Sequence, residues 1–292
     1  MNRNAMKLED SLGKYEVDLR GSTLPLPVEV VETEVDLYYR MAFTLYHLIE
    51  EQNRKGQPTT VILPVGPVFQ YRRFVWLQRE RPLDLRKVTL FFMDEYLTEE
   101  GEWVEENFPL SFRGFVRREL LTPLQDPSLP PEARLLDTQV LFPDPKNLAG
   151  FDARYAERGG ADVCFAGIGI TGHLAFNEPP PAGNPMTTEE FRNLPSRVVT
   201  LAPETIAINS NTALRGAMDC IPKQAVTIGF RQILQARKLR IYCNRPWQSG
   251  VVRRALFDPV SPEFPVTLVR EHPDVRFTVT AEVAEPPSFG LR

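Results

Sequence analysis

Short apolar runs that alternate with helical segments constrain the fold of this chain more than any other feature. The runs 59–63, 88–93 and 161–166 are continuously apolar or β-branched, as expected of strands buried on both faces. Segments 35–53 and 69–79 carry apolar residues at helical spacing. Strands that alternate with helices in this way predict an α/β fold with a mostly parallel sheet and helices on both faces.

The rest of the chain extends the same alternation. Further strands are expected within 28–31, 135–142, 225–228, 239–243 and 275–279, and further helices within 111–121 and 147–158. Residues 1–27 lack clear periodicity and are expected to form an N-terminal extension on the surface. No internal repeat or low-complexity linker divides the remainder, so 28–292 is predicted to be a single domain.

Composition excludes several classes of partner. The net charge is −4 with acids and bases mixed, which argues against nucleic acid binding. No apolar run approaches the roughly 18 residues that cross a bilayer, so no membrane partner is expected. The chain starts with a polar segment, and its three cysteines are widely spaced. These features predict a cytoplasmic protein without disulfides or a metal site.

Three loops follow the expected strands and carry unusual residues. They span 64–67, 94–96 and 167–179. In parallel sheets, ligands bind beyond the carboxyl ends of the strands. We therefore expect these three loops to meet at one crevice.

The glycine-rich loop permits two interpretations. Gly167, Gly169 and Gly172 match the spacing of the dinucleotide fingerprint, which also needs a helix opening at the last glycine. Here three consecutive prolines begin only seven residues later, at 179, which argues against that helix and against a nucleotide cofactor. The alternative is a turn whose backbone N–H groups approach an anion or a sugar oxygen.

His173 in this loop is a candidate acid–base group. Glu178 follows five residues later, and a carboxylate beside an imidazole fixes its tautomer. The other histidines, His47 and His272, are interpreted as structural.

Asp94 and Glu95 end an otherwise apolar run. They form either a solvated strand end or a carboxylate pair at the mouth of the crevice. Apolar neighbours would raise the pKa of such a carboxylate toward neutrality, as a catalytic base requires.

These motifs resemble one known family. Phe-Phe-Met-Asp-Glu-Tyr at 91–96 and Gly-His-Leu-Ala-Phe-Asn-Glu-Pro at 172–179 are similar to glucosamine-6-phosphate deaminases, whose broader relatives are the 6-phosphogluconolactonases. Supporting matches lie at 196–201, 207–210 and 221–229. The resemblance covers roughly 35–283 and leaves out a proline-rich insert at 180–195.

The resemblance implies a modified Rossmann-like domain, a homo-oligomer, and cofactor-independent chemistry on a small sugar or sugar phosphate. It implies ring opening, proton transfer between C2 and C1, and release of ammonia. Asp94 would be the base, His173 with Glu178 would assist ring opening, and Lys223 would contact the phosphate. Arg197 would occupy the position of an effector-site arginine. The other expected substrate contacts are Gly66, Glu95, Gly167, Gly169, Thr171 and Gly172.

Three departures from the family pattern affect the expected substrate. Thr171 stands where the family has an aspartate, and the phosphate loop reads Gly-Pro-Val-Phe at 66–69. Asn211 replaces a phosphate-binding arginine, for which Arg215, or Arg72 and Arg73, are the possible substitutes. The sequence therefore predicts a deaminase or isomerase with altered phosphate recognition. The alternatives are a non-catalytic sugar or sugar-phosphate binding protein and a 6-phosphogluconolactonase-like hydrolase.

Overall fold

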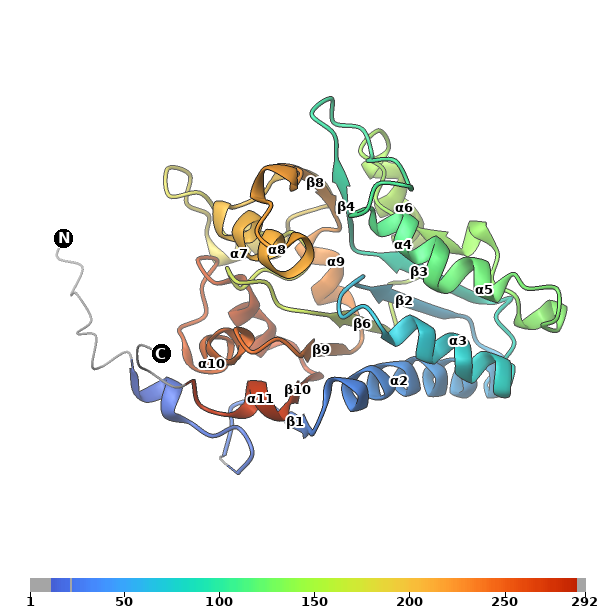
Figure 1. Cartoon of the computed structure of the whole chain (residues 1–292), viewed down its shortest axis with the longest axis horizontal. Coiled ribbons are helices and arrows are strands. Elements are labelled where there is room, and N and C mark those ends of the chain that lie inside the picture. The colour runs from blue at the N-terminus through green and yellow to red at the C-terminus, as the bar shows by residue number, and fades with distance from the viewer. Residues whose placement is uncertain (1–11, 22, 288–292) are drawn as a thin grey trace.

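The computed structural model describes residues 12–21 and 23–287. Its main sheet has seven strands in the order β1-β10-β9-β6-β2-β3-β5, and every neighbouring pair is parallel (Figure 1). The strands are β1 Val28–Val31, β2 Thr59–Leu63, β3 Val88–Phe92, β5 Val140–Leu141, β6 Val163–Ala166, β9 Leu239–Cys243 and β10 Val275–Thr280. The predicted α/β class with a mostly parallel sheet is confirmed.

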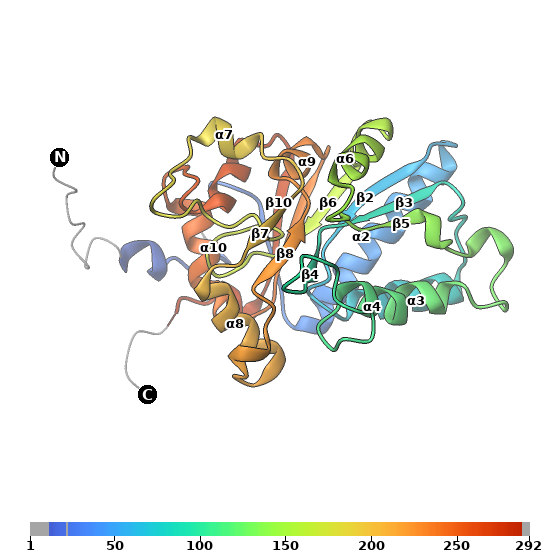
Figure 2. The ribbon, with the colours of Figure 1, turned by 90° about the horizontal axis from the view of Figure 1, so that it is seen from above.

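Helices cover both faces of this sheet, as Figure 2 shows from above. One apolar core joins the sheet to α2 Glu34–Arg54, α3 Gln70–Glu80 and a helical stretch made of α4 Phe112–Val116, a π-helical turn Arg117–Leu121 and α5 Thr122–Leu124. A second core contains α6 Leu148–Glu157, α9 Phe230–Gln235, α10 Gln248–Phe257 and α11 Ala281–Ala284. Short 3₁₀ turns lie at Gly13–Glu16, Pro131–Ala133, Asp137–Gln139, Met218–Cys220 and Pro265–Glu271.

Helix α2 illustrates how local sequence sets these elements. Thr33 accepts a hydrogen bond from the backbone N–H of Asp36, and the Asp36 carboxylate accepts one from the backbone N–H of Thr33. This reciprocal cap starts the helix. Beyond its end, Gly56 has a φ of +67°, a conformation that glycine adopts without steric cost.

A second, three-stranded antiparallel sheet corrects the sequence prediction. It consists of β4 Asp94–Leu97, β8 Gln224–Thr227 and β7 Arg197–Thr200, with β8 in the middle. The segment 94–96 was expected to be a loop but forms strand β4, and 225–228 was expected as an ordinary strand of the main sheet. β7 was not predicted as a strand, because four residues with alternating burial give little signal. Helices α7 Thr188–Arg192 and α8 Pro203–Leu214 flank β7 in the chain.

The N-terminal segment is partly integrated into the fold. Residues 1–11 and 22 of the predicted extension lie outside the described residues. Within the described part, Leu19 is buried and its N–H donates to the Ala284 carbonyl. The fully buried Arg253 of α10 donates to the Val17 carbonyl from Nε and Nη2, at 3.0 and 2.7 Å. Among the described helices, none has the length and apolar character needed to span a membrane.

Candidate active site

The expected crevice exists at the carboxyl ends of four parallel strands. A cavity of about 230 Å³ opens where β2, β3, β6 and β9 end. Its wall includes 64–68 after β2, Met93 and Asp94 after β3, and 167–169 after β6. The chain proceeds from β2 to β3 on one side and returns to β6 on the other, so the cavity lies at the point where strand order reverses.

Asp94 presents a buried carboxylate to this cavity. The residue is 7% exposed, and no hydrogen bond from another described residue reaches its oxygens. Burial, together with the negative charge of Glu95, raises the pKa of the Asp94 carboxyl well above its usual value. A carboxylate in this state is suited to accept a proton near neutral pH.

His173 lines the same cavity and is held from behind by two side chains. Thr171 Oγ1 lies 2.8 Å from His173 Nδ1 and donates to Glu178 Oε2 at 2.6 Å, while Nδ1 lies 3.0 Å from the same carboxylate oxygen. Because the single Thr171 proton points to Glu178, the proton between His173 and these oxygens belongs to Nδ1. Nε2 lies beside Gly169 at the cavity wall and has no hydrogen bond with a described residue.

Glu178 remains ionised in this arrangement. Burial alone would raise its pKa, but the charge and hydrogen bond of His173 and the hydroxyls of Thr171 and Thr205 lower it to about 2. Its Oε1 also accepts from the Ala202 N–H, at 3.4 Å, at the N-terminus of α8. The buried Thr205 was missed by the sequence prediction, since nothing local marks a threonine inside a helix as part of a site.

Close packing requires two glycines of this loop. A Cβ at Gly169 would lie 1.9 Å from His173 Nε2, so only glycine admits the imidazole. Gly172 has a φ of +80°, and a Cβ there would collide with Phe264. No helix opens at Gly172, because the next one begins at Thr188. The dinucleotide interpretation therefore has no structural counterpart.

A second set of contacts ties the histidine loop to β7 and β8. The completely buried Asn177 donates from Nδ2 to the carbonyls of Leu174 and Ile228, each at 3.0 Å. Arg197 Nη1 donates to Asn177 Oδ1 at 2.7 Å. Burial lowers the pKa of Arg197 to about 10, and no carboxylate within the described residues pairs with it. Arg197 thus supports the loop from outside the cavity.

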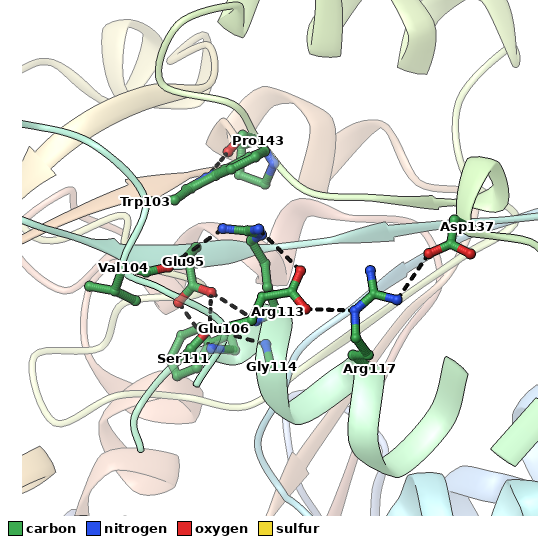
Figure 3. Close-up of polar contacts among 11 residues, drawn as sticks. Glu95, Trp103, Val104, Glu106, Ser111, Arg113, Gly114, Arg117, Asp137 and Pro143 are labelled. Carbon is green, nitrogen blue, oxygen red and sulfur yellow. Dashed lines mark hydrogen bonds and ion pairs between the residues drawn. The ribbon is translucent and has the colours of Figure 1, made fainter. Parts of the chain in front are cut away.

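Glu95, an expected substrate contact, instead caps a helix. It is completely buried and absent from the cavity wall. Figure 3 shows its carboxylate at the start of α4, where it accepts from Ser111 Oγ, Phe112 N and Arg113 N at 2.8 to 3.0 Å. Arg113 stacks on Trp103 and, with Arg117, pairs with Glu106. Glu95 therefore connects the chain next to Asp94 to helix α4.

The structure separates several of the other predicted contacts from the cavity. Lys223 is exposed and lines a different cavity, formed with 97–99 and 219–222, at the far end of β8. Asn211 and Arg215 are exposed and do not line the site. Arg72 pairs with Glu119, and Arg73 stacks on Tyr39 at 4.9 Å. Of the predicted substrate contacts, the cavity wall contains Gly66, Gly167 and Gly169, while Thr171 lies behind His173.

The loop after β9 contributes residues that the sequence prediction missed. The cavity wall includes Asn244, Arg245, Trp247 and Gln248. Gln248 organises this loop, because its Nε2 donates to the Ile168 carbonyl and its Oε1 accepts from the N–H groups of Asn244 and Arg245. Arg245 has no ion pair with a described residue. The strand-end rule applied to 239–243 would have located these residues.

Known proteins resemble this chain in sequence and in fold. No protein-family model matches the chain. It is 30% identical over 219 residues to glucosamine-6-phosphate deaminase of Porphyromonas gingivalis, covering 74% of this chain and 76% of the relative. It is 28% identical over 268 residues to that of Rhodopirellula baltica, covering 90% and 97%.

Solved structures share the fold. A monomeric glucosamine-6-phosphate deaminase superposes with a TM-score of 0.73 at 21% identity, over 89% of this chain and 99% of the other. The 6-phosphogluconolactonase of Trypanosoma cruzi superposes with a TM-score of 0.64 at 18% identity, over 91% and 98%. On the strength of the sequence relatives, this chain belongs to the glucosamine-6-phosphate deaminase family.

Proposed function

We propose that this chain converts an amino-sugar phosphate of the glucosamine-6-phosphate type into a keto-sugar phosphate and ammonia. The observation that carries the proposal is the pairing of Asp94 and His173 in one cavity. One is a carboxylate with a raised pKa, and the other is an imidazole held by an ionised Glu178. The names of the sequence relatives support the same substrate class.

His173 is assigned to ring opening. Its unprotonated Nε2 accepts the proton of the anomeric hydroxyl, the bond from C1 to the ring oxygen breaks, and the ring oxygen receives a proton from the same nitrogen. Glu178 stabilises the transient imidazolium through Nδ1, 3.0 Å away. The product of this step is the open-chain aldehyde.

Asp94 is assigned to proton transfer. It removes the proton from C2 and, after an enolamine forms, returns it to C1. The C1 oxygen gains a proton as the amino nitrogen loses one, which leaves a hydroxyl at C1 and an imine at C2. Addition of water to this imine releases ammonia and gives the ketone. A carboxylate whose pKa is raised by burial suits both halves of this transfer.

Phosphate recognition is proposed to rest on Arg245. The loop after β2 offers few donors, because Pro67 has no N–H and Val68 no hydroxyl. Arg245 lines the same cavity without an ion pair to a described residue, so its guanidinium is available to an anion. Arg245 therefore replaces Arg72, Arg73 and Arg215, the arginines that the sequence offered as phosphate ligands.

Ammonia release from glucosamine-6-phosphate tests the reaction, with free glucosamine as the unphosphorylated comparison. Asp94→Asn is expected to lower kcat by roughly 10²- to 10⁴-fold, the usual contribution of a general base. Asp219→Asn, an exposed aspartate, is the control and should retain activity. Full activity of Asp94→Asn would exclude this residue as the base.

The phosphate assignment has its own test. Arg245→Gln is expected to raise KM for the phosphorylated substrate about tenfold or more, because a charge-assisted hydrogen bond is lost. It should not affect KM for an unphosphorylated amino sugar. An equal change for both would point to a structural role.

A lactonase activity is the second candidate, favoured by the fold shared with 6-phosphogluconolactonases. It predicts acid release from a sugar-phosphate lactone without ammonia. If the protein binds the sugar phosphate but releases neither ammonia nor acid, the non-catalytic alternative is favoured.

Self-association is proposed through the outer face of α2 and α3. Val35, Phe43, Phe69 and Trp76 are exposed there, and Tyr39 stacks on Phe43 at 6.0 Å. Exposed apolar patches of this kind mark interaction sites. Analytical ultracentrifugation should show an oligomer that Phe43→Glu dissociates, and a wild-type chain that is monomeric at every concentration would contradict the proposal.

A further inference from the structure

A second cavity lies on the α2 side of the sheet, away from the catalytic residues. Its volume is about 510 Å³, and it is bounded by β1, β9, β10 and α2. Its wall holds three arginines and three hydroxyl groups, which belong to Arg40, Arg240, Arg276, Thr44, Tyr242 and Thr278. Glu29 is the one carboxylate among the residues that line it.

The position of these side chains is unusual for a parallel sheet. β9 and β10 are inner strands, whose two faces are normally covered by apolar side chains. The register pairs Arg276 with Arg240 and Thr278 with Tyr242, so these four side chains share one face. The packing of helices against the sheet does not require polar side chains on this face. We therefore interpret these four side chains as part of a binding site.

The cavity carries an excess of positive charge. Arg40 pairs with Glu29 at 2.6 Å, and Arg240 pairs with Asp274 at 2.8 Å. Arg276 has no carboxylate within 4.0 Å in the part of the chain that the structure describes. Its guanidinium is therefore available to a ligand, beside two arginines that keep unused N–H donors.

Hydroxyl donors complement this charge. The Tyr242 hydroxyl makes only a long contact, 3.4 Å, with Thr44 Oγ1. Burial raises the pKa of Tyr242 to about 12, so it remains a neutral donor at physiological pH. Within residues 12–21 and 23–287, no group forms a hydrogen bond with the Thr278 hydroxyl. A cavity lined by three arginines and three hydroxyls, with one carboxylate, favours an oxyanion.

We propose that this cavity binds the phosphate group of a small phosphorylated molecule. Arginine and hydroxyl donors are the groups that recognise phosphate oxygens, and the volume lies within the ~300–1,000 Å³ range of small-molecule sites. The site is separate from Asp94 and His173, and Tyr242 is the one residue that lines both cavities. The proposal does not depend on the proposed reaction.

Isothermal titration calorimetry on the full chain tests it, with glucose 6-phosphate, AMP and inorganic phosphate as probes at constant ionic strength. Arg276→Gln is expected to weaken one class of binding at least about tenfold, the effect of losing one charge-assisted hydrogen bond. Arg158→Gln is the matched control, since Arg158 is exposed, unpaired among the described residues and remote from both cavities. Arg245→Gln removes the anion contact of the catalytic cavity and identifies binding there.

The outcomes separate the possibilities. Loss of binding in Arg276→Gln with retention in Arg158→Gln and Arg245→Gln supports the site, and the probe bound most tightly shows whether an ester or free phosphate is its ligand. A single class of binding that only Arg245→Gln abolishes would overturn the proposal. An equal effect of Arg158→Gln would also overturn it, because it would show a general effect of surface charge.

Discussion

Asp94 is placed where its charge destabilises the folded chain. Its carboxylate is buried beside Glu95, and its pKa is raised in the folded state. Between the unfolded pKa of 3.8 and that raised value, the native state binds more protons than the unfolded state. Its contribution to stability therefore declines as pH rises through this window.

Replacement of Asp94 by Asn is accordingly expected to stabilise the protein. At pH 7 to 8, urea unfolding should show a higher free energy of unfolding for the variant than for the wild type. The gain should vanish below about pH 3.8, where the wild-type side chain is also neutral. Destabilisation at neutral pH would show that the carboxylate has a stabilising partner.

Glu178 behaves in the opposite way. Its pKa of about 2 lies below the ordinary glutamate value of 4.5, so the ionised form contributes stability above pH 4.5 that is lost as pH falls toward 2. Glu178→Gln should lower the free energy of unfolding at pH 7 by roughly 1–3 kcal/mol, because buried hydrogen bonds to the carboxylate are lost. It should also lower kcat, because His173 Nδ1 loses its charged partner.

A matched control for this experiment is Glu204→Gln, an exposed glutamate in the first turn of α8. Its effect should be small at every pH. If unfolding of Glu178→Gln showed the same pH dependence as the wild type, the low pKa assigned to Glu178 would be wrong.

At the level of elements, the junction between β3 and β4 defines the site. β3 ends at Phe92, and β4 begins at Asp94 in a different sheet. Met93 joins the two, since its N–H donates to the Leu63 carbonyl of β2 and its carbonyl accepts from the Ile228 N–H. The turn of the chain at Met93 brings Asp94 to the cavity.

Glu95 fixes this junction to α4, so Glu95→Gln is expected to destabilise the fold. Each carboxylate oxygen accepts two hydrogen bonds, one pair from Tyr96 N and Phe112 N, the other from Ser111 Oγ and Arg113 N. An amide nitrogen in place of either oxygen leaves buried donors unpaired, at a cost of about 1–3 kcal/mol each. Urea unfolding measures the loss, and Glu99→Gln on the neighbouring exposed loop should be neutral.

For the whole molecule, Arg253 joins segments far apart in the sequence. Its guanidinium donates to the carbonyls of Val17, Ser249, Val283 and Ala284. It therefore connects the N-terminal segment, α10 and α11 near both ends of the described chain (Figure 1).

Arg253→Met is expected to lower stability and release the N-terminal segment. Several buried carbonyls would lose their donor, which costs roughly 2–5 kcal/mol in total. Trypsin should then cleave after Arg20 much faster than in the wild type, as mass spectrometry would show. Arg158→Met is the control, and unchanged cleavage at Arg20 would mean that other contacts hold the segment.

Much of this architecture follows from local patterns. Continuous apolar runs predicted β2, β3 and β6, because a strand buried on both faces is apolar at every position. Apolar residues at helical spacing predicted α2 and α3, because a helix buried on one face is apolar only along that face. β7 gave no such pattern, since its partner β8 lies elsewhere in the chain and sets its pairing. The same reason explains why 94–96 was predicted as a loop.

The sequence by itself determined the α/β class, the crevice loops at 64–67 and 167–179, and the pairing of His173 with Glu178, because strand ends and a five-residue spacing are local properties. Only the tertiary structure decided which polar residues face the cavity. It turned Glu95 toward α4, placed Lys223 in another cavity, and brought Arg245 to the site from the end of β9. These outcomes depend on contacts between segments that are distant in the chain. Such contacts arise from tertiary packing and leave no local pattern in the sequence.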